Sequence, residues 1–141
     1  MEFTQLPSLE ILDLSENRFS SWPKYVEGCS VLQKLYLTAN EITTLDNMKK
    51  IKGGQLAQLE ELCLDMNQIE DVPAEIGLLA ALSELSLADN DAIGTLPKGF
   101  ERLTDLETLD IDGCSIDKQG LPSGVREMVL ELAPDSGGES D

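Results

Sequence analysis

Apolar residues recur in one nine-residue pattern at five places along the chain. The five copies read LEILDLSEN, LQKLYLTAN, LEELCLDMN, LSELSLADN and LETLDIDGC, and they begin at residues 9, 32, 59, 82 and 106. Apolar residues alternate with other residues in the middle of each copy, which predicts a short strand whose side chains point to opposite faces. In the third copy we expect Leu62 and Leu64 to point into the core, and Cys63 and Asp65 to point outward.

A second pattern, led by a proline, fills the space between these predicted strands. The stretches WPKYVEGCSVL, VPAEIGLLAAL and LPKGFERLTDL begin at residues 22, 72 and 96, and LPSGVREM begins at residue 121. Apolar residues follow each proline at steps of three or four, which predicts a helical or 3₁₀-like return segment with one buried stripe. Trp22 and Cys29 both fall on positions predicted to lie in the core.

The second unit and the two ends depart from this regular frame. Residues 45–59, LDNMKKIKGGQLAQL, hold about four extra residues and predict a bulged loop on the convex side, either solvated or a local docking bump. Phe3 and Leu6 repeat the spacing of a return segment. Residues 125–132 predict a helix that caps the array, with a strand over 128–132 as the alternative. A helix there has one apolar stripe, made of Val125, Met128, Val129 and Leu132.

The array has a predicted extent and a predicted tail. Residues 1–132 form the repeat domain, and residues 133–141, APDSGGESD, predict a disordered acidic tail. Stacked repeats usually need polar caps at both ends, and no dedicated N-terminal cap is visible. We therefore expect either a piece of a longer array or ends that a partner covers.

Each pattern closes on a residue suited to the turn that follows the strand. These residues are Asn17, Asn40, Asn67, Asn90 and Cys114. A buried asparagine amide can bond backbone groups that the turn leaves unpaired. Cysteine has less hydrogen-bonding capacity but is small and weakly polar, so it fits the same place.

The repeated L-x-x-L-x-L-x-x-N/C pattern resembles the leucine-rich repeat superfamily over nearly the whole chain. Its Leu-Pro return segments resemble the intracellular Ras-associated scaffold type, and residues 90–97, NDAIGTLP, are also similar to plant-type repeats. The resemblance implies an α/β solenoid with a short parallel sheet on the concave face and helical, 3₁₀ or irregular return segments on the convex face. It also implies that ligands bind the concave stripe.

The outward strand positions predict the composition of that concave stripe. The candidate partner-binding residues are Asp13, Lys34, Tyr36, Glu61, Cys63, Asp65, Glu84, Ser86, Asp110 and Asp112. We expect Tyr36 and Cys63 to be exposed, with Cys63 unreactive because its acidic neighbours do not lower its pKa. The acidic stripe fits recognition of a basic partner, and it also fits a role in solubility alone.

Charge narrows the classes of partner. The chain carries 27 acidic and 10 basic residues and a formal net charge of -17, which argues against nucleic acid and against anionic membrane surfaces. A protein partner with a basic surface is the class that remains. The uncapped ends of the solenoid offer a further possible contact.

Cysteine usage and the N-terminus indicate the compartment. Cys29, Cys63 and Cys114 are odd in number and widely spaced, which indicates reduced thiols. The first ten residues do not read as a signal peptide. We expect a cytoplasmic protein, with a nuclear one possible.

The sequence provides no set of residues typical of catalysis. It has no histidine, and its cysteines lack the spacing of a zinc site. The stretch DNDAIG at 89–94 is similar to the start of a calcium loop, but Ile93 and Phe100 stand at ligand positions. We therefore predict no metal, no cofactor and no enzymatic activity.

Three hypotheses for function remain at this stage. The first is a protein-interaction scaffold that binds a partner on its acidic concave face. The second is an acidic nuclear regulator that binds histones or other basic proteins. The third is the recognition segment of a larger signalling or immune-type protein. The sequence favours the first hypothesis, and the other two are its alternatives.

Overall fold

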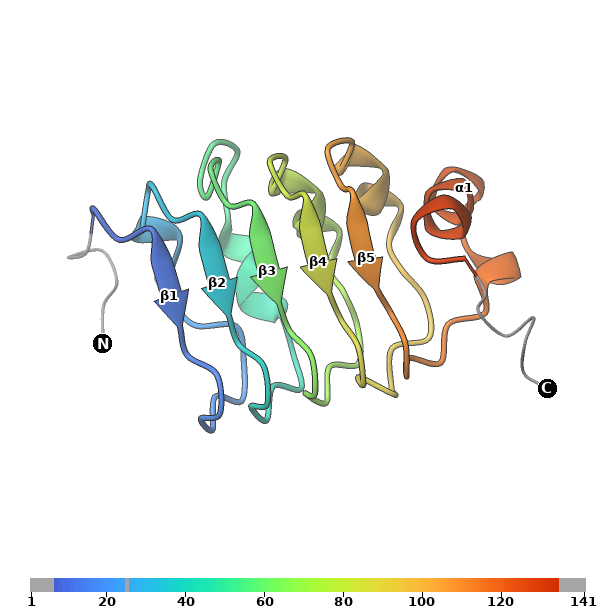
Figure 1. The fold of residues 1–141 in the computed structure, drawn as a ribbon, viewed down its shortest axis with the longest axis horizontal. Coiled ribbons are helices and arrows are strands. Elements are labelled where there is room, and N and C mark those ends of the chain that lie inside the picture. Colours follow the sequence, from blue (N-terminus) through green and yellow to red (C-terminus); the bar gives the residue numbers. More distant parts are fainter. Residues whose placement is uncertain (1–6, 25, 135–141) are drawn as a thin grey trace.

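The computed structural model describes residues 7–24 and 26–134. The predictions made for Phe3 and Leu6, and most of the predicted tail, lie outside these residues. Five parallel strands form one sheet in the order β1-β2-β3-β4-β5, so neighbours in sequence are neighbours in space. Figure 1 shows the strands side by side, with the return segments stacked behind them.

Each strand is only three residues long. The strands are β1 (Ile11–Asp13), β2 (Lys34–Tyr36), β3 (Glu61–Cys63), β4 (Glu84–Ser86) and β5 (Thr108–Asp110). Each lies within one copy of the nine-residue pattern. The central leucine of every strand points inward, and Leu35, Leu62 and Leu85 are 0–1% exposed. The expected leucine-rich repeat solenoid is confirmed.

The return segments contain 3₁₀ helices, and the proline-led pattern predicts those that follow Pro23, Pro73 and Pro97. The 3₁₀ helices are η2 (Val26–Gly28), η3 (Asp46–Lys50), η4 (Ala74–Leu78), η5 (Lys98–Arg102) and η6 (Lys118–Gly120), followed by the α-helix α1 (Ser123–Leu132). The helix decides between the two alternatives for residues 125–132. Val125 and Val129 are buried, and Met128 and Leu132 pack against the core. Trp22 and Cys29 are fully buried, as expected.

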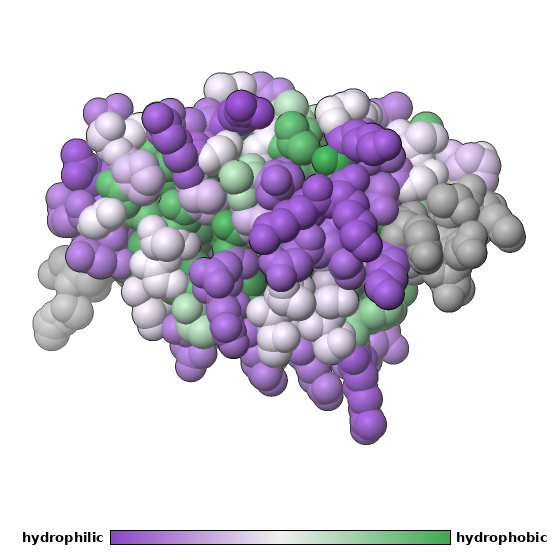
Figure 2. Space-filling view, turned by 180° about the vertical axis from the view of Figure 1, so that it is seen from behind, coloured by the Kyte–Doolittle hydropathy of each residue, from purple (hydrophilic) through white to green (hydrophobic). Residues whose placement is uncertain are grey.

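The extra residues of the second unit follow η3. Ile51 and Leu56 are buried, whereas Lys49, Lys50 and Lys52 are exposed. Lys49 pairs with Asp46 within the same turn at 3.4 Å. The surface on the return-segment side of the molecule is mainly hydrophilic, with apolar side chains showing between the polar ones (Figure 2).

Asparagine side chains join the inner units at the turn after each strand. In Asn40, Asn67 and Asn90, the Nδ2 amide donates both to a carbonyl of its own unit and to a carbonyl of the preceding unit, at 2.9–3.0 Å. Each Oδ1 accepts a backbone N–H from the preceding unit at 3.0 Å. These three asparagines are almost fully buried.

The two ends of this series differ from its middle. Asn17 is exposed rather than buried, and its Nδ2 donates only to Leu14 and Ser15 of its own unit. The reason is that no described unit precedes it to cover the side chain. Cys114 stands in the fifth unit, where its Sγ donates to the Leu87 carbonyl at 3.2 Å.

The residue before each asparagine, or before Cys114, has a left-handed backbone. The φ angles are +58° at Glu16, +59° at Ala39, +58° at Met66, +59° at Asp89 and +84° at Gly113. The turn requires this conformation in all five units, yet glycine, which adopts it without strain, occupies it only once. In the sequence, only Gly113 indicates a left-handed turn, although all five units adopt this conformation.

Candidate binding surface

Two rows of outward side chains cross the sheet because the strands pair in the same register. One row places Ile11 beside Lys34, then Glu61, Glu84 and Thr108. The second row places Asp13 beside Tyr36, then Cys63, Ser86 and Asp110. The structure thus brings together the predicted residues of the sheet in the order of their units.

A third row lies just past the ends of the strands and consists of Ser15, Thr38, Asp65, Ala88 and Asp112. Backbone bonds carry the pairing onward, because the Ala39 amide donates to the Asp65 carbonyl at 2.9 Å and the Asp89 amide donates to the Asp112 carbonyl at 2.8 Å. Asp65 and Asp112 therefore extend the same surface. We call these three rows, from Ile11 to Asp112, the concave face.

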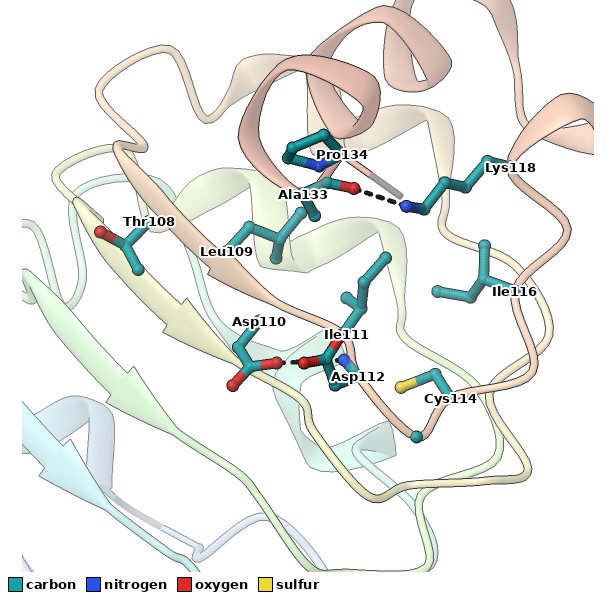
Figure 3. Close-up of a pocket in the computed structure, with 11 residues that line it drawn as sticks. Thr108, Leu109, Asp110, Ile111, Asp112, Cys114, Ile116, Lys118, Ala133 and Pro134 are labelled. Carbon is teal, nitrogen blue, oxygen red and sulfur yellow. Dashed lines mark hydrogen bonds between the residues drawn. The ribbon is translucent and has the colours of Figure 1, made fainter. Parts of the chain in front are cut away.

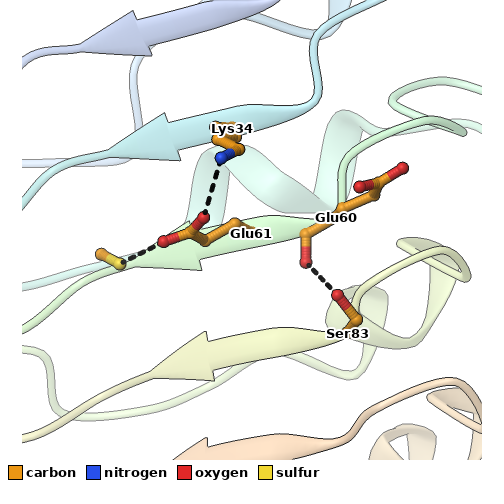
Figure 4. Close-up of polar contacts among 5 residues, drawn as sticks. Lys34, Glu60, Glu61 and Ser83 are labelled. Atoms are coloured by element: carbon orange, nitrogen blue, oxygen red, sulfur yellow. Dashed lines mark hydrogen bonds and ion pairs between the residues drawn. The ribbon is translucent and has the colours of Figure 1, made fainter.

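One ion pair lies near the middle of the concave face. Lys34 Nζ lies 3.7 Å from Glu61 Oε1, and Cys63 Sγ donates to Glu61 Oε2 at 3.9 Å (Figure 4). Lys34 is the one basic residue in the three rows, while six positions are acidic. Because Glu61 engages this lysine, the other carboxylates of the face have no basic partner within the rows.

Two polar atoms on this face are buried without a hydrogen-bond partner in the described part of the chain. They are Asp65 Oδ1 and Ser86 Oγ, on neighbouring units. Buried polar atoms in folded proteins are nearly always hydrogen-bonded, so each such atom calls for a reason.

The surroundings of Cys63 raise the pKa of its thiol. Burial, together with the smaller effects of the carboxylates of Asp65, Glu61, Glu84 and Asp13 in that order, raises the pKa of this thiol to about 12. Acidic residues of three units therefore act on one point of the face. The shift keeps the thiol protonated and makes it a poor nucleophile, in the direction expected from the sequence.

Tyr36 and Cys63 are half-buried rather than exposed. The expectation that both are exposed was wrong, because Glu61 lies beside both side chains. Burial raises the pKa of the Tyr36 hydroxyl, and Glu61 adds to the effect. Both residues still border the open face, with part of each side chain accessible.

Two of the row carboxylates are partly engaged by their own loops. The Ser15 amide donates to Asp13 Oδ1 at 2.9 Å, and this bond lowers the pKa of the exposed Asp13 carboxyl. The Asp112 amide donates in the same way to Asp110 Oδ1 at 3.0 Å. These bonds fix the orientation of both carboxylates near the two edges of the sheet.

The described residues offer little for metal or membrane chemistry. Within residues 7–24 and 26–134, no group of three or more potential ligands lies close enough to hold a metal ion. No helix in the same part of the chain has the length and apolar character needed to cross a bilayer.

Comparison with known families identifies the fold. A model described as Leucine rich repeat matches residues 57–116, and a second model of the same kind matches residues 8–29. The chain belongs to the leucine-rich repeat superfamily. Proteins of this superfamily generally mediate protein–protein interactions, and the fold is typically a non-catalytic module.

Two curated relatives show how widely this pattern occurs. Vasorin of Mus musculus is 32% identical over 130 residues, which cover 90% of this chain and 18% of vasorin. The Plant intracellular Ras-group-related LRR protein 8 of Oryza sativa subsp. japonica is 34% identical over 82 residues, which cover 57% of this chain and 21% of that protein. The chain therefore spans about a fifth of the length of these relatives.

Solved structures show the same architecture. A leucine-rich repeat protein of Leptospira interrogans superposes with a TM-score of 0.72 at 34% identity, covering 93% of this chain and 31% of that one. The plant peptide hormone receptor RGFR1, solved in complex with RGF2, superposes with a TM-score of 0.68 at 29% identity, covering 81% of this chain and 18% of the receptor.

Proposed function

We propose that this chain is a non-enzymatic interaction module that binds a basic segment of a protein partner on its concave face. The observation that carries the proposal is the excess of acidic side chains on the concave face, where six acidic positions stand against the single lysine Lys34. Ammonium or guanidinium groups of a partner would pair with these carboxylates and balance their charge.

The arrangement of the rows supports an extended rather than a compact contact. The acidic positions recur on units one, three, four and five, and neighbouring strands of a sheet stand about 5 Å apart. A partner that crosses the strands would thus meet a carboxylate at Asp13, Glu61, Glu84 and Asp110 in turn. Tyr36 provides an aromatic contact within the same path.

The complex with a peptide hormone in a structural neighbour also supports a protein ligand. Long-range attraction between the net charge of -17 and a basic partner would speed association and weaken with salt. The three free cysteines support a reducing compartment, so we propose a cytoplasmic or nuclear location.

Binding of a lysine- and arginine-rich peptide at several salt concentrations tests the function. A variant with Asp65→Lys, Glu84→Lys and Asp110→Lys should lose at least about tenfold in affinity, because each reversal removes an attraction and adds a repulsion. The matched control reverses three exposed acidic residues outside the concave face, Glu70, Asp71 and Asp105.

The two variants carry the same net charge. If the peptide binds the concave face, the two variants should therefore differ in their affinity for it. We expect the control to bind nearly as well as the original chain, with affinity falling as salt rises. Equal losses in both variants would show that only total charge matters. Binding that does not change with salt would also overturn the proposal.

A further inference from the structure

Charge is distributed unevenly among the five units of the concave face. The row positions of units one and two hold one acidic residue, Asp13, and one basic residue, Lys34, so their formal charges cancel. The row positions of units three to five hold no basic residue and five acidic ones, which are Glu61, Asp65, Glu84, Asp110 and Asp112. The boundary between a neutral part and an acidic part therefore lies between β2 and β3.

The acidic part continues without interruption from β3 to the turn after β5. Glu84 of β4 stands between Glu61 and Thr108 in the first row. Figure 3 shows Asp110 and Asp112 close together at the end of β5, where the Asp112 amide donates to Asp110 Oδ1. Basic side chains of a partner would thus meet only carboxylates and neutral groups over these three units.

Lys34 stands at the boundary and pairs with the first carboxylate of the acidic part. Its Nζ lies 3.7 Å from Glu61 Oε1, and the two side chains are 43% and 21% exposed (Figure 4). An ion pair with this much access to water adds little stability, so a basic group of a partner could replace Lys34 at little cost. In the chain alone, Lys34 occupies Glu61 in the way that a basic residue of a partner would.

The neutral part offers apolar contacts around Lys34. Ile11 stands directly beside Lys34 in the first row, and Tyr36 lies two residues farther along the same strand. Because side chains alternate along a strand, Lys34 and Tyr36 point to the same face. Ile11 and Tyr36 are the largest apolar and aromatic side chains of the three rows. This part of the face therefore suits an apolar residue of a partner, while Lys34 repels a basic one.

We propose that Lys34 sets the direction in which a partner lies across the concave face. By occupying Glu61 and repelling other cations, it confines the basic residues of the partner to the carboxylates beyond Glu61. Units one and two are left to an apolar residue. The ligand class is an extended segment with an apolar residue at one end and a run of lysine or arginine toward the other. This inference rests on the proposed function, to which it adds the order of the partner's residues.

The dimensions of the sheet set the length of such a segment. Neighbouring strands stand about 5 Å apart, so the five strands together span about 20 Å. An extended chain covers about 3.3 Å per residue, so about six residues cross the whole face. A capped peptide Leu-Gly-Gly-Arg-Arg-Arg is therefore the probe.

NMR of the full chain with two spin-labelled forms of this peptide tests the direction. One form carries a nitroxide at its leucine end, and the other carries it at its arginine end. Because the two groups of amides lie roughly 15 Å apart, the leucine-end label should broaden the signals of Lys34 and Tyr36 at least about threefold more than those of Asp110 and Asp112. The arginine-end label should do the reverse. Equal broadening of both groups by both labels would overturn the inference.

A double-mutant cycle tests whether Lys34 acts through Glu61. Glu61→Gln should lower the peptide affinity of the Lys34→Gln variant at least about threefold more than it lowers that of the original chain, because the peptide uses Glu61 only when Lys34 is absent. Lys98→Gln is the matched control, since it removes the same charge from an exposed position on η5. The control should leave the effect of Glu61→Gln unchanged, and an equal effect of Glu61→Gln in all three backgrounds would overturn the role of Lys34.

The variant with Asp65→Lys, Glu84→Lys and Asp110→Lys separates failure of this inference from failure of the proposed function. If this variant binds the peptide as well as the original chain does, or if the original chain does not bind it, both proposals are wrong. If the variant loses binding but the cycle shows no coupling, or the labels show no preferred direction, only the role of Lys34 is wrong. Loss of binding together with coupling and a preferred direction would support both.

Discussion

The side-chain amide of Asn67 donates to the carbonyl oxygen of Leu37, 30 residues away in sequence, at 3.0 Å. The same side chain accepts the Ile42 amide at 3.0 Å and donates to Leu64 of its own unit at 3.0 Å. One buried asparagine therefore holds two adjacent units at two points. This link keeps the strands in register, and that register is what aligns the rows of the concave face.

Replacing Asn67 by alanine should destabilise the fold by roughly 1–3 kcal/mol, because buried backbone groups of both units lose their partners. The matched control is Asn17→Ala, whose side chain is exposed and bonds only its own unit. The control should cost less than about 1 kcal/mol. Chemical denaturation measures the free energy of unfolding of both variants. Equal losses of stability would show that the inner asparagines have no special role.

Because Met66 has a left-handed backbone, we expect glycine to be well tolerated at this position. Its φ of +58° strains any residue with a Cβ, by roughly 1 kcal/mol. We expect Met66→Gly to be at least as stable as Met66→Ala, the reference that removes the side chain alone. Met66→Val should be the least stable of the three, since a β-branched residue fits this conformation worst. A thermal melt with valine equal to glycine would contradict the left-handed turn.

Two glycines set the spacing of the convex side, where η4 and η5 pack closely. A Cβ added at Gly99 would lie 2.4 Å from the Ala74 carbonyl oxygen, and one added at Gly77 would lie 2.3 Å from the Gly99 carbonyl oxygen. Gly99→Ala should therefore destabilise the protein by about 1–3 kcal/mol. Gly94→Ala is the control, because its added Cβ meets nothing within 4 Å. Denaturation midpoints that shift equally in both would contradict this packing.

Stability should fall in alkaline solution through Cys63. The folded-state pKa of this thiol is raised from 9.0 to about 12, so between these values the unfolded chain releases the proton while the folded chain keeps it. Release of the proton favours the unfolded state. The stability that the folded chain gains by keeping the thiol protonated is therefore fully present below about pH 9 and is lost as the pH rises toward 12. Cys63→Ser should lessen the decline measured by denaturation between pH 8 and 11. An unchanged slope would show that other groups cause it.

The outward residues of the concave face could be predicted from the sequence because successive side chains of a strand point to opposite faces. Once the LEELCLDMN pattern is placed as a strand, Cys63 and Asp65 must point away from Leu62 and Leu64. The degree of exposure could not be read in the same way. Cys63 is half-buried because Glu61 of its own unit packs beside it, with Lys34 next to that glutamate, and these contacts depend on rotamers that spacing does not specify.

The sequence alone determined the number of units, the inward leucines and the asparagine positions, because each follows from a short period along one chain. Only the tertiary structure decided which asparagines are buried and which turn residues are left-handed. The physical reason is that these properties arise between units. Asn17 and Asn67 occupy the same position in the pattern, yet among the described residues only Asn67 has a preceding unit against which to pack. The identical pattern therefore makes one exposed turn and one buried link.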